Sequence, residues 1–371
     1  MSHIRLVLAD KDSMFLEKFS AYLQKNKATR FSLELFTSSI KLDSWLEKGG
    51  KADLIAISST LFSKMVKKPE SKNVVILSDN SESLLPQDYN CIHKYKPAEN
   101  LMKEMLSLCA ENLPQSINKK EDSGRVHLVL YADGSDVLNP MAQTLASIFS
   151  KSLRSTIYLS LDDLSNTDAY FSGNNSKGLS EMLYYVKSQK ENLSLRAEAC
   201  TSRDFEIGVD FMRGHQNPED LGELKSSECE SLIEAIRGRA CYDDIIISRA
   251  FQYDALLPVL FKNAHKIYIT ALDYRSSIER LLKILNLLSK FEDQSGIDLK
   301  DKVLVCITLL NKNLQASSQE LFCGPNKTQQ PQVIDISHYQ KTFLPFPFEE
   351  GVSFFPPSGE YQSALKKIVD Q

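Results

Sequence analysis

The sequence predicts an α/β protein built from two doubly wound parallel sheets that follow one another along the chain. Short continuous runs of Val, Ile and Leu alternate with segments of helical spacing, which is typical of strands buried on both faces of a parallel sheet. One polar segment without a periodic apolar pattern interrupts this alternation. For a chain of 371 residues we therefore expect a first domain over 1–113, a linker over 114–124 and a second domain over 125–371.

The first domain is expected to contain five strands with helices between them. The expected strands are 4–9, 31–36, 53–57, 74–77 and 91–95, and the expected helices are 15–23, 40–47 and 99–113. Five short strands in a segment of this length indicate a sheet of the flavodoxin type.

The second domain repeats the same plan over a longer segment. Its expected strands are 126–131, 156–161, 245–247, 266–270 and 303–308, and its expected helices are 140–153, 179–186, 275–291 and 360–369. An aromatic and Pro-rich segment, 343–351, precedes the last helix. The leucines of the helix 275–291 recur at helical spacing, so we interpret it as a core helix; a dimer or membrane-facing surface is the alternative.

Composition excludes several classes of protein. The net charge of −4 gives no broad basic field, so we expect no nucleic-acid partner. The amino-terminal segment carries charges within its apolar run and is not expected to be a signal peptide, and no apolar stretch reaches the ~18 residues of a membrane span. The seven cysteines lack any CxxC pair, so we expect reduced thiols, no bound metal and a cytoplasmic protein.

Four segments of the first domain resemble those of a receiver domain, and the resemblance covers roughly residues 3–112. They are LVLADKD (6–12), DLIAIS (53–58), VVILS (74–78) and KYKP (94–97). The resemblance places Asp10 at the first metal-binding acid with Asp12 close by, Ser78 at the hydroxyl that follows the fourth strand, and Lys96 at the lysine that follows the fifth.

Two positions depart from the receiver pattern. Ser58 stands where the resemblance implies the phosphoacceptor aspartate, and a serine cannot form an acyl phosphate. Lys11 stands at the second acidic place, where its charge would repel Mg²⁺. We therefore interpret this domain as a pseudo-receiver that serves as an interaction module.

The segment after the first strand of the second domain resembles the phosphate loop and first helix of MinD/ParA ATPases. This segment is ADGSDVLNPMAQTLA (132–146), and the chain contains no GKS or GKT motif. In this alignment Leu138 stands at the phosphate-binding lysine and Asn139 at the threonine pair, while Asp136 adds a negative charge and Gly134 is the loop's one glycine. The loop is therefore a poor anion site.

Further segments match the same family in order and spacing. They are TIYLSLDDLS (156–165), CYDDIIISRAF (241–251), VLVCITLLNK (303–312) and LPFPFEEG (344–351). Ser248 replaces the aspartate that ends the family's metal-binding strand, Asp162 lies near the place of its catalytic aspartate, and Asn311 would face an adenine. The residues assigned to a vestigial nucleotide pocket are Gly134, Ser135, Asp136, Asn139, Asp162 and Asn311.

A receiver-like domain fused to a MinD/ParA-like domain resembles the TadZ/CpaE-type pilus assembly and localisation proteins. The stretch 158–192 resembles the variant of this group from Gram-positive anaerobes. The resemblance implies a homodimeric protein that binds partners of a Tad-type pilus machine, including its secretion ATPase. Partners would recruit it from the cytoplasm to the inner face of the membrane or the cell pole.

Two functions remain open. We favour a non-catalytic scaffold without cofactors, because Leu138, Ser248 and Ser58 replace the residues of catalysis. The alternative is a switch that binds ATP and Mg²⁺ and dimerises with little or no hydrolysis. It would need a substitute cation, and Lys151 and Arg154 lie about three turns or more past the loop. A transcription regulator is a weaker reading, because no helix-turn-helix is recognisable.

Three smaller alternatives accompany these functions. The acid pairs 162–163 and 243–244 could serve acid–base catalysis, but we favour helix caps or solvated strand ends. Cys241 has no histidine partner, so we interpret it as an inert thiol. The helix 361–369 is short and weakly basic, so peripheral membrane contact is a minority interpretation.

Overall fold

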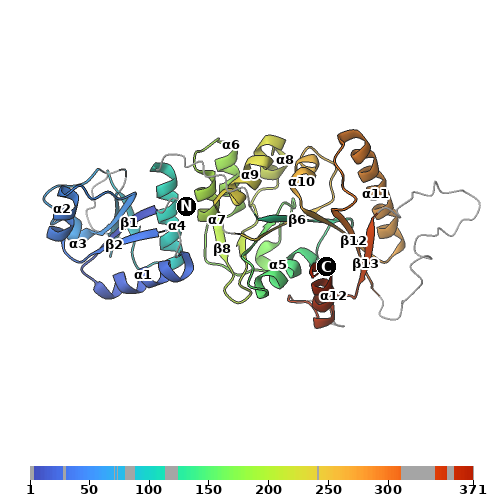
Figure 1. Ribbon diagram of the computed structural model, residues 1–371, viewed down its shortest axis with the longest axis horizontal. Coiled ribbons are helices and arrows are strands. Elements are labelled where there is room, and N and C mark those ends of the chain that lie inside the picture. The colour runs from blue at the N-terminus through green and yellow to red at the C-terminus, as the bar shows by residue number, and fades with distance from the viewer. Residues whose placement is uncertain are drawn as a thin grey trace, which may run out of the picture.

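The computed structural model describes residues 4–27, 31–70, 72, 74–79, 88–112, 124–239, 242–310, 339–348 and 355–370. These residues form two α/β units, each built around its own sheet (Figure 1). The predicted fold class is confirmed. The expected linker 114–124 lies outside the described residues except for Gly124, so the domain boundaries stay a prediction.

The first unit is a five-stranded parallel sheet in the order β2-β1-β3-β4-β5. Its strands are β1 (Ile4–Ala9), β2 (Phe31–Phe36), β3 (Leu54–Ser58), β4 (Val74–Ser78) and β5 (Asn90–His93). Its helices are α1 (Ser13–Lys27), α2 (Ser39–Glu47), α3 (Ser59–Phe62) and α4 (Ala98–Asn112). The strands β3 and β4 are buried throughout, because α1 and α4 cover one face of the sheet and α2 and α3 cover the other.

The second unit is an eight-stranded sheet in the order β13-β12-β11-β6-β10-β7-β9-β8. Its strands are β6 (Arg125–Tyr131), β7 (Thr156–Ser160), β8 (Thr201–Arg203), β9 (Asp210–Met212), β10 (Asp244–Ala250), β11 (Lys266–Leu272), β12 (Val303–Thr308) and β13 (Gln340–Leu344). Strand β8 pairs antiparallel with β9 at one edge, whereas the strands from β13 to β9 run parallel. The pair β8–β9 and strand β13 were missed by the sequence, because three-residue strands and a half-exposed edge strand lack a continuous apolar run.

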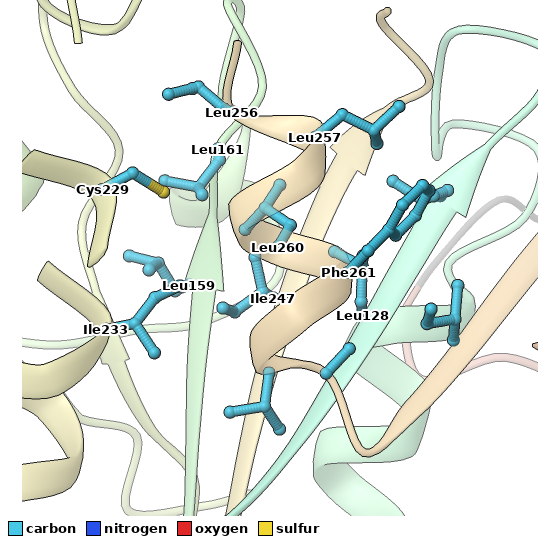
Figure 2. Packing of buried hydrophobic residues seen from close by; sticks show 14 of the residues in the cluster. Leu128, Leu159, Leu161, Cys229, Ile233, Ile247, Leu256, Leu257, Leu260 and Phe261 are labelled. Atoms are coloured by element: carbon cyan, nitrogen blue, oxygen red, sulfur yellow. The ribbon is translucent and has the colours of Figure 1, made fainter. Parts of the chain in front are cut away.

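Helices cover both faces of the second sheet. They are α5 (Met141–Lys151), η2 (Thr167–Ala169), α6 (Leu179–Lys187), α7 (Leu193–Cys200), α8 (Glu219–Gly222), α9 (Ser226–Arg239), α10 (Leu257–Asn263), α11 (Arg275–Ser295) and α12 (Gly359–Val369). Successive residues of one strand point into different cores: Ile245 and Ile247 pack under α9 and α10, and Ile246 packs under α5. Figure 2 shows the first of these cores, where α10 lies over β10 and β6.

Two helix interpretations from the sequence can be compared with this packing. Helix α11 buries Ile278, Leu281, Ile284, Leu285 and Leu288, which confirms a core helix. Helix α12 packs beside α5, with Tyr361 and Leu365 buried in the second core (Figure 1). Among the described residues, no helix combines the length and the apolar character that crossing a bilayer requires.

The two units share a packed junction formed by α4 and α7 (Figure 1). Leu195 and Ala199 of α7 belong to the same buried cluster as α1, α4 and the first sheet. Hydrogen bonds also cross the junction: Lys177 Nζ donates to Ser107 Oγ at 2.8 Å, Asn192 Nδ2 donates to the backbone oxygen of α4 residue 110 at 3.0 Å, and the backbone N–H of Arg203 donates to Glu99 Oε1 at 3.3 Å. The units are therefore joined by a hydrophobic core as well as by the chain.

Candidate functional site

The loop 132–140 links β6 to α5 at the carboxyl edge of the second sheet, where parallel α/β proteins bind their ligands. Gly134 adopts a positive φ of 82°, which turns the chain immediately after the strand. Leu138, at the predicted lysine position, is 47 % exposed, whereas Asn139 is buried. One backbone hydrogen bond closes the loop on itself: the amide of Asn139 donates to the oxygen of Asp136 at 2.9 Å.

The amino-terminal end of α5 is capped by the protein itself. A phosphate at such a helix end would accept bonds from free backbone N–H groups. Here the N–H of Ala142 donates to the hydroxyl of Tyr131 at 3.2 Å, and that of Met141 donates to the backbone oxygen of Asn139 at 2.7 Å. Two donors of the helix start are therefore already used.

Asn139 forms the centre of a buried hydrogen-bond network. Its Nδ2 donates to the hydroxyls of Thr270 and Thr308, the latter at 2.9 Å, and its Oδ1 accepts from the hydroxyl of Tyr361. These partners come from β11, β12 and α12, so one side chain ties the loop to two strands and the last helix. At the position that the resemblance assigns to a Mg²⁺-binding hydroxyl, the protein thus has an amide that three of its own hydroxyls contact.

Asp136 forms a second network beside the first. Gln143 Nε2 donates to Asp136 Oδ2 at 2.5 Å, and Asn166 Nδ2 donates to Asp136 Oδ1 at 3.1 Å. Gln143 Nε2 also lies 3.0 Å from the hydroxyl of Tyr158, which lies 2.8 Å from Ser248 Oγ. Burial raises the pKa of Asp136, although the two amides oppose that shift. The network therefore joins the loop carboxylate to Ser248, the residue that replaces the metal-binding aspartate.

Asp162 lies in the segment that follows β7, near the same edge. Its Oδ1 accepts a hydrogen bond from the backbone N–H of Ala250, at the end of β10. Burial, together with the charge of Asp136, raises the pKa of Asp162 to about 6, although the Ala250 N–H and the charge of Arg249 oppose the shift. Of the remaining pocket residues, Ser135 is exposed and accepts from the N–H of residue 137 at 3.2 Å, and Asn311 lies outside the described residues.

The two predicted acid pairs lie at opposite edges of the sheet, because Asp162 and Asp163 follow β7 whereas Asp243 and Asp244 precede or begin β10. Asp244 is fully buried and pairs with His127 at 2.9 Å. Asp243 accepts from the backbone N–H of the residue before β7 at 2.8 Å. The separation of the two pairs speaks against joint catalysis, but the contacts of Asp162, Asp243 and Asp244 are not helix caps and Asp244 is not a solvated strand end; these three acids instead bond to neighbouring strands or to a buried histidine. Cys241 lies outside the described residues.

Lys151 and Arg154, which the sequence already placed far from the loop, bind elsewhere. Lys151 contacts Gln362 at 3.3 Å, and Arg154 pairs with Asp244 at the opposite edge of the sheet, at 2.5 Å. The sequence missed Arg280 of α11, whose Nη2 would lie 3.9 Å from a Cβ at Gly134. Helical spacing on α11 gave no sign of this, because the contact depends on how α11 packs against the sheet.

Exposed apolar side chains gather at the carboxyl edge of the second sheet. Each of six residues follows a parallel strand and is 41 % or more exposed: Val137, Leu138, Leu164, Tyr253, Tyr274 and Leu310. We call these six the edge apolar residues. Apolar groups gathered on one face are typical of protein interaction surfaces.

The receiver-like residues converge only in part. Asp10 is buried, with Asp12 more exposed beside it, and both lie near the ammonium of Lys94. Ser58 is buried and bonds to the hydroxyl of residue 60 at 3.2 Å, and Ser78 is buried at the end of β4. Lys96, the lysine that the sequence selected, instead points to an exposed ion pair at 2.6 Å with a glutamate of α4.

Comparisons with known proteins address the fold. No protein-family model matches the chain, and no curated protein sequence matches it. A ParA family ATPase from Chlorobium tepidum TLS superposes with a TM-score of 0.52 and 14% identity, covering 68% of this chain and 99% of that chain. A putative plasmid partition protein from Borrelia burgdorferi B31, bound to AMPPNP, gives a TM-score of 0.47 and 15% identity over 67% of this chain and 97% of its own.

The MinD cell division protein of Aquifex aeolicus gives a TM-score of 0.47 and 14% identity, over 67% of this chain and 98% of its own. The covered share of this chain is similar to the share made up by residues 125–371. Sequence identities this low support a shared fold and do not establish a shared function. The chain therefore contains a ParA/MinD-type ATPase fold.

Proposed function

We propose that this chain is a non-catalytic, self-associating scaffold that localises Tad-type (Flp) pilus assembly or secretion. It would act in the cytoplasm beside the secretion ATPase of the machine, and partners would recruit it to the inner face of the membrane or the cell pole. It would require neither ATP nor Mg²⁺. The observation that carries the non-catalytic part is the closed pair of networks around Asp136 and Asn139.

These networks oppose nucleotide binding in two ways. The carboxylate of Asp136 lies in the loop itself, so its charge would repel any phosphate that approached. Entry of a metal ion at Asn139 would also break its bonds to Thr308, Thr270 and Tyr361, each worth about 1 kcal/mol net. A nucleotide would have to replace all of these contacts before it contributed any affinity.

The edge apolar residues support self-association. In a two-fold dimer the same surface meets itself, so a patch with apolar side chains and charges of both signs can be self-complementary. Exposed Asp163 and Arg275 follow β7 and β11 at this edge, where the acid of one copy could meet the base of the other. We therefore propose a dimer through this edge that forms without nucleotide.

Mass measurement by light scattering tests this dimer. Leu138→Asp and Leu164→Asp should each weaken dimerisation at least about tenfold, because a buried carboxylate replaces an apolar contact. Leu153→Asp is the matched control, since Leu153 is 96 % exposed and lies beyond the other end of α5. Unchanged dimerisation in both edge variants would remove this surface from the proposal.

The second candidate function is a nucleotide switch, and Arg280 is the observation that favours it. Its guanidinium could supply the positive charge that Leu138 cannot. Titration of Mg²⁺-ATP into the purified protein separates the two functions: the scaffold proposal expects no heat at millimolar ATP and an unchanged mass. Micromolar binding that drives dimerisation, and that Arg280→Gln abolishes, would support the switch instead.

The pilus role needs its own test. The purified chain should retain the Tad-type secretion ATPase encoded in the same genome, in buffer with EDTA and without nucleotide. An unrelated hexameric secretion ATPase serves as the control for nonspecific binding. Failure to bind under these conditions, with both proteins folded, would contradict the assignment to this machine while leaving the dimer proposal open.

A further inference from the structure

Three acids and one lysine meet at the carboxyl edge of the first sheet. Asp10 and Asp12 follow β1, Asp79 follows β4 and Lys94 follows β5. Lys94 Nζ lies 3.1 Å from Asp10 Oδ2, 3.1 Å from Asp79 Oδ1 and 3.9 Å from Asp12 Oδ2. The side chains of Lys94 and Asp10 are each only 4 % exposed, whereas those of Asp12 and Asp79 are 43 % and 41 % exposed, so the ammonium is buried while the cluster opens to water on the side of these two acids.

The surroundings of Lys94 favour its charged form. The ammonium also lies 5.4 Å from the ring centroid of Phe15 and 5.0 Å from that of Tyr95, within the range of cation–π attraction. Burial alone would lower the pKa of Lys94, but the hydrogen bonds and charges of Asp79 and Asp10 outweigh it and raise that pKa. The lysine is therefore a permanent cation at this point.

The resemblance to receiver domains implies a divalent cation among these acids, and the residues present do not fit one. A hard cation draws its oxygen ligands to about 2.0–2.6 Å and leaves no room for an ammonium at the centre of the same acids. The described part of the chain contains no group of three or more His, Cys, Asp or Glu residues that could hold a metal ion. Asp10, Asp12 and Asp79 instead face Lys94.

We propose that the ammonium of Lys94 permanently takes the place of a divalent cation in this acidic site. The charge of the three acids is then partly balanced by a side chain of the same unit, and the unit keeps one conformation whether or not Mg²⁺ is present. A partner could then bind this unit at any time, because its binding surface would not depend on Mg²⁺ or on phosphorylation. The inference concerns the first unit and does not depend on the scaffold function.

Removing the lysine should uncover the site. In calorimetry with MgCl₂ and MnCl₂ on the full chain, Lys94→Met should bind the divalent cation at least about tenfold more tightly than the wild type, because three carboxylates lose their counter-ion. Lys96→Met is the matched control, since Lys96 lies two residues further on in an exposed ion pair. It should behave as the wild type does. Mg²⁺ should also raise the thermal midpoint of Lys94→Met alone, by mass action.

Two results would overturn the proposal. One is tight Mg²⁺ binding by the wild type at this unit, and the other is a folded Lys94→Met protein that binds no more divalent cation than the wild type. If Lys94→Met does not fold, the wild type itself can be tested by NMR with ¹⁵N-labelled lysine. The Nζ resonances of the buried lysines Lys94 and Lys103 should both be protected from exchange with water, and contacts to the rings of Phe15 and Tyr95 identify that of Lys94. The Lys94 resonance should be unchanged by Mg²⁺; its displacement by Mg²⁺ would refute a permanent occupant.

Discussion

Replacement of Asn139 tests whether its buried hydrogen bonds stabilise the loop 132–140 and with it the second unit. Asn139→Ala removes the partner of the Thr270, Thr308 and Tyr361 hydroxyls at once. Three hydrogen bonds at about 1 kcal/mol each, together with hydroxyls left unsatisfied in a buried place, give a loss of about 3–4 kcal/mol. Tyr361→Phe removes one of these bonds and should cost about 1 kcal/mol.

Urea unfolding followed by circular dichroism measures these losses in the free energy of unfolding. The single tryptophan, Trp45, lies on α2 of the first unit, so its fluorescence monitors the other unit in the same samples. The double variant should lose less than the sum of the single losses, because both changes remove the same bond between Asn139 and Tyr361.

The reasoning fails if Asn139→Ala changes the free energy of unfolding by less than about 0.5 kcal/mol, which is the range of ordinary surface substitutions. It also fails if the two losses are strictly additive. In the first case the loop would be loosely held, and a ligand could displace Asn139 easily. The nucleotide switch would then become the stronger of the two candidate functions.

Three further predictions follow from individual side chains. Burial raises the pKa of Asp162 from 3.8 to about 6, so its proton stabilises the fold below pH 3.8 and this contribution is lost as the pH rises through 6. Asp162→Asn should therefore raise the free energy of unfolding by about 1–3 kcal/mol at pH 7.5 and hardly at all at pH 4, as measured by urea unfolding at both values. Leu281→Ala should lower the free energy of unfolding, measured with urea, by about 2–5 kcal/mol, because Leu281 is buried. Leu287→Ala, on the exposed side of the same helix, should lower it by less than about 0.5 kcal/mol. Equal losses would contradict the core assignment of α11. Lys103→Met should lower the free energy of unfolding by about 2–4 kcal/mol, because the buried carboxylate of Glu99 loses its cation and keeps the backbone N–H of Arg203 as a donor. Lys262→Met breaks an exposed pair and should lower it by at most about 1 kcal/mol, and similar losses would argue against a buried junction.

The sequence predicted the sheet cores well because burial on both faces leaves a visible pattern. The run 126–131 is apolar throughout, and the structure places it in the middle of the second sheet. Edge elements gave a weaker pattern: β13 is exposed over its first two residues, and β8 is three residues long. Such segments become strands through pairing with neighbours, which local periodicity does not record.

The site was harder to predict because its contacts join distant parts of the chain. The sequence singled out Asn139, but its partner Tyr361 lies 222 residues away on the last helix. In the first unit, the Lys-Pro pair pointed to Lys96, whereas Lys94 carries the buried ammonium. Lys94 and Lys96 lie two residues apart but point in different directions. The packing of Lys94 against Phe15 and Tyr95, which the sequence does not show, places its ammonium in the acidic site.

The junction between α4 and α7 has a consequence for how this protein can be divided. Leu195 and Ala199 complete a core that otherwise belongs to the first unit. Each unit produced alone would therefore expose to solvent the apolar side chains that the other unit buries. Separately expressed halves should therefore tend to aggregate or to find each other again.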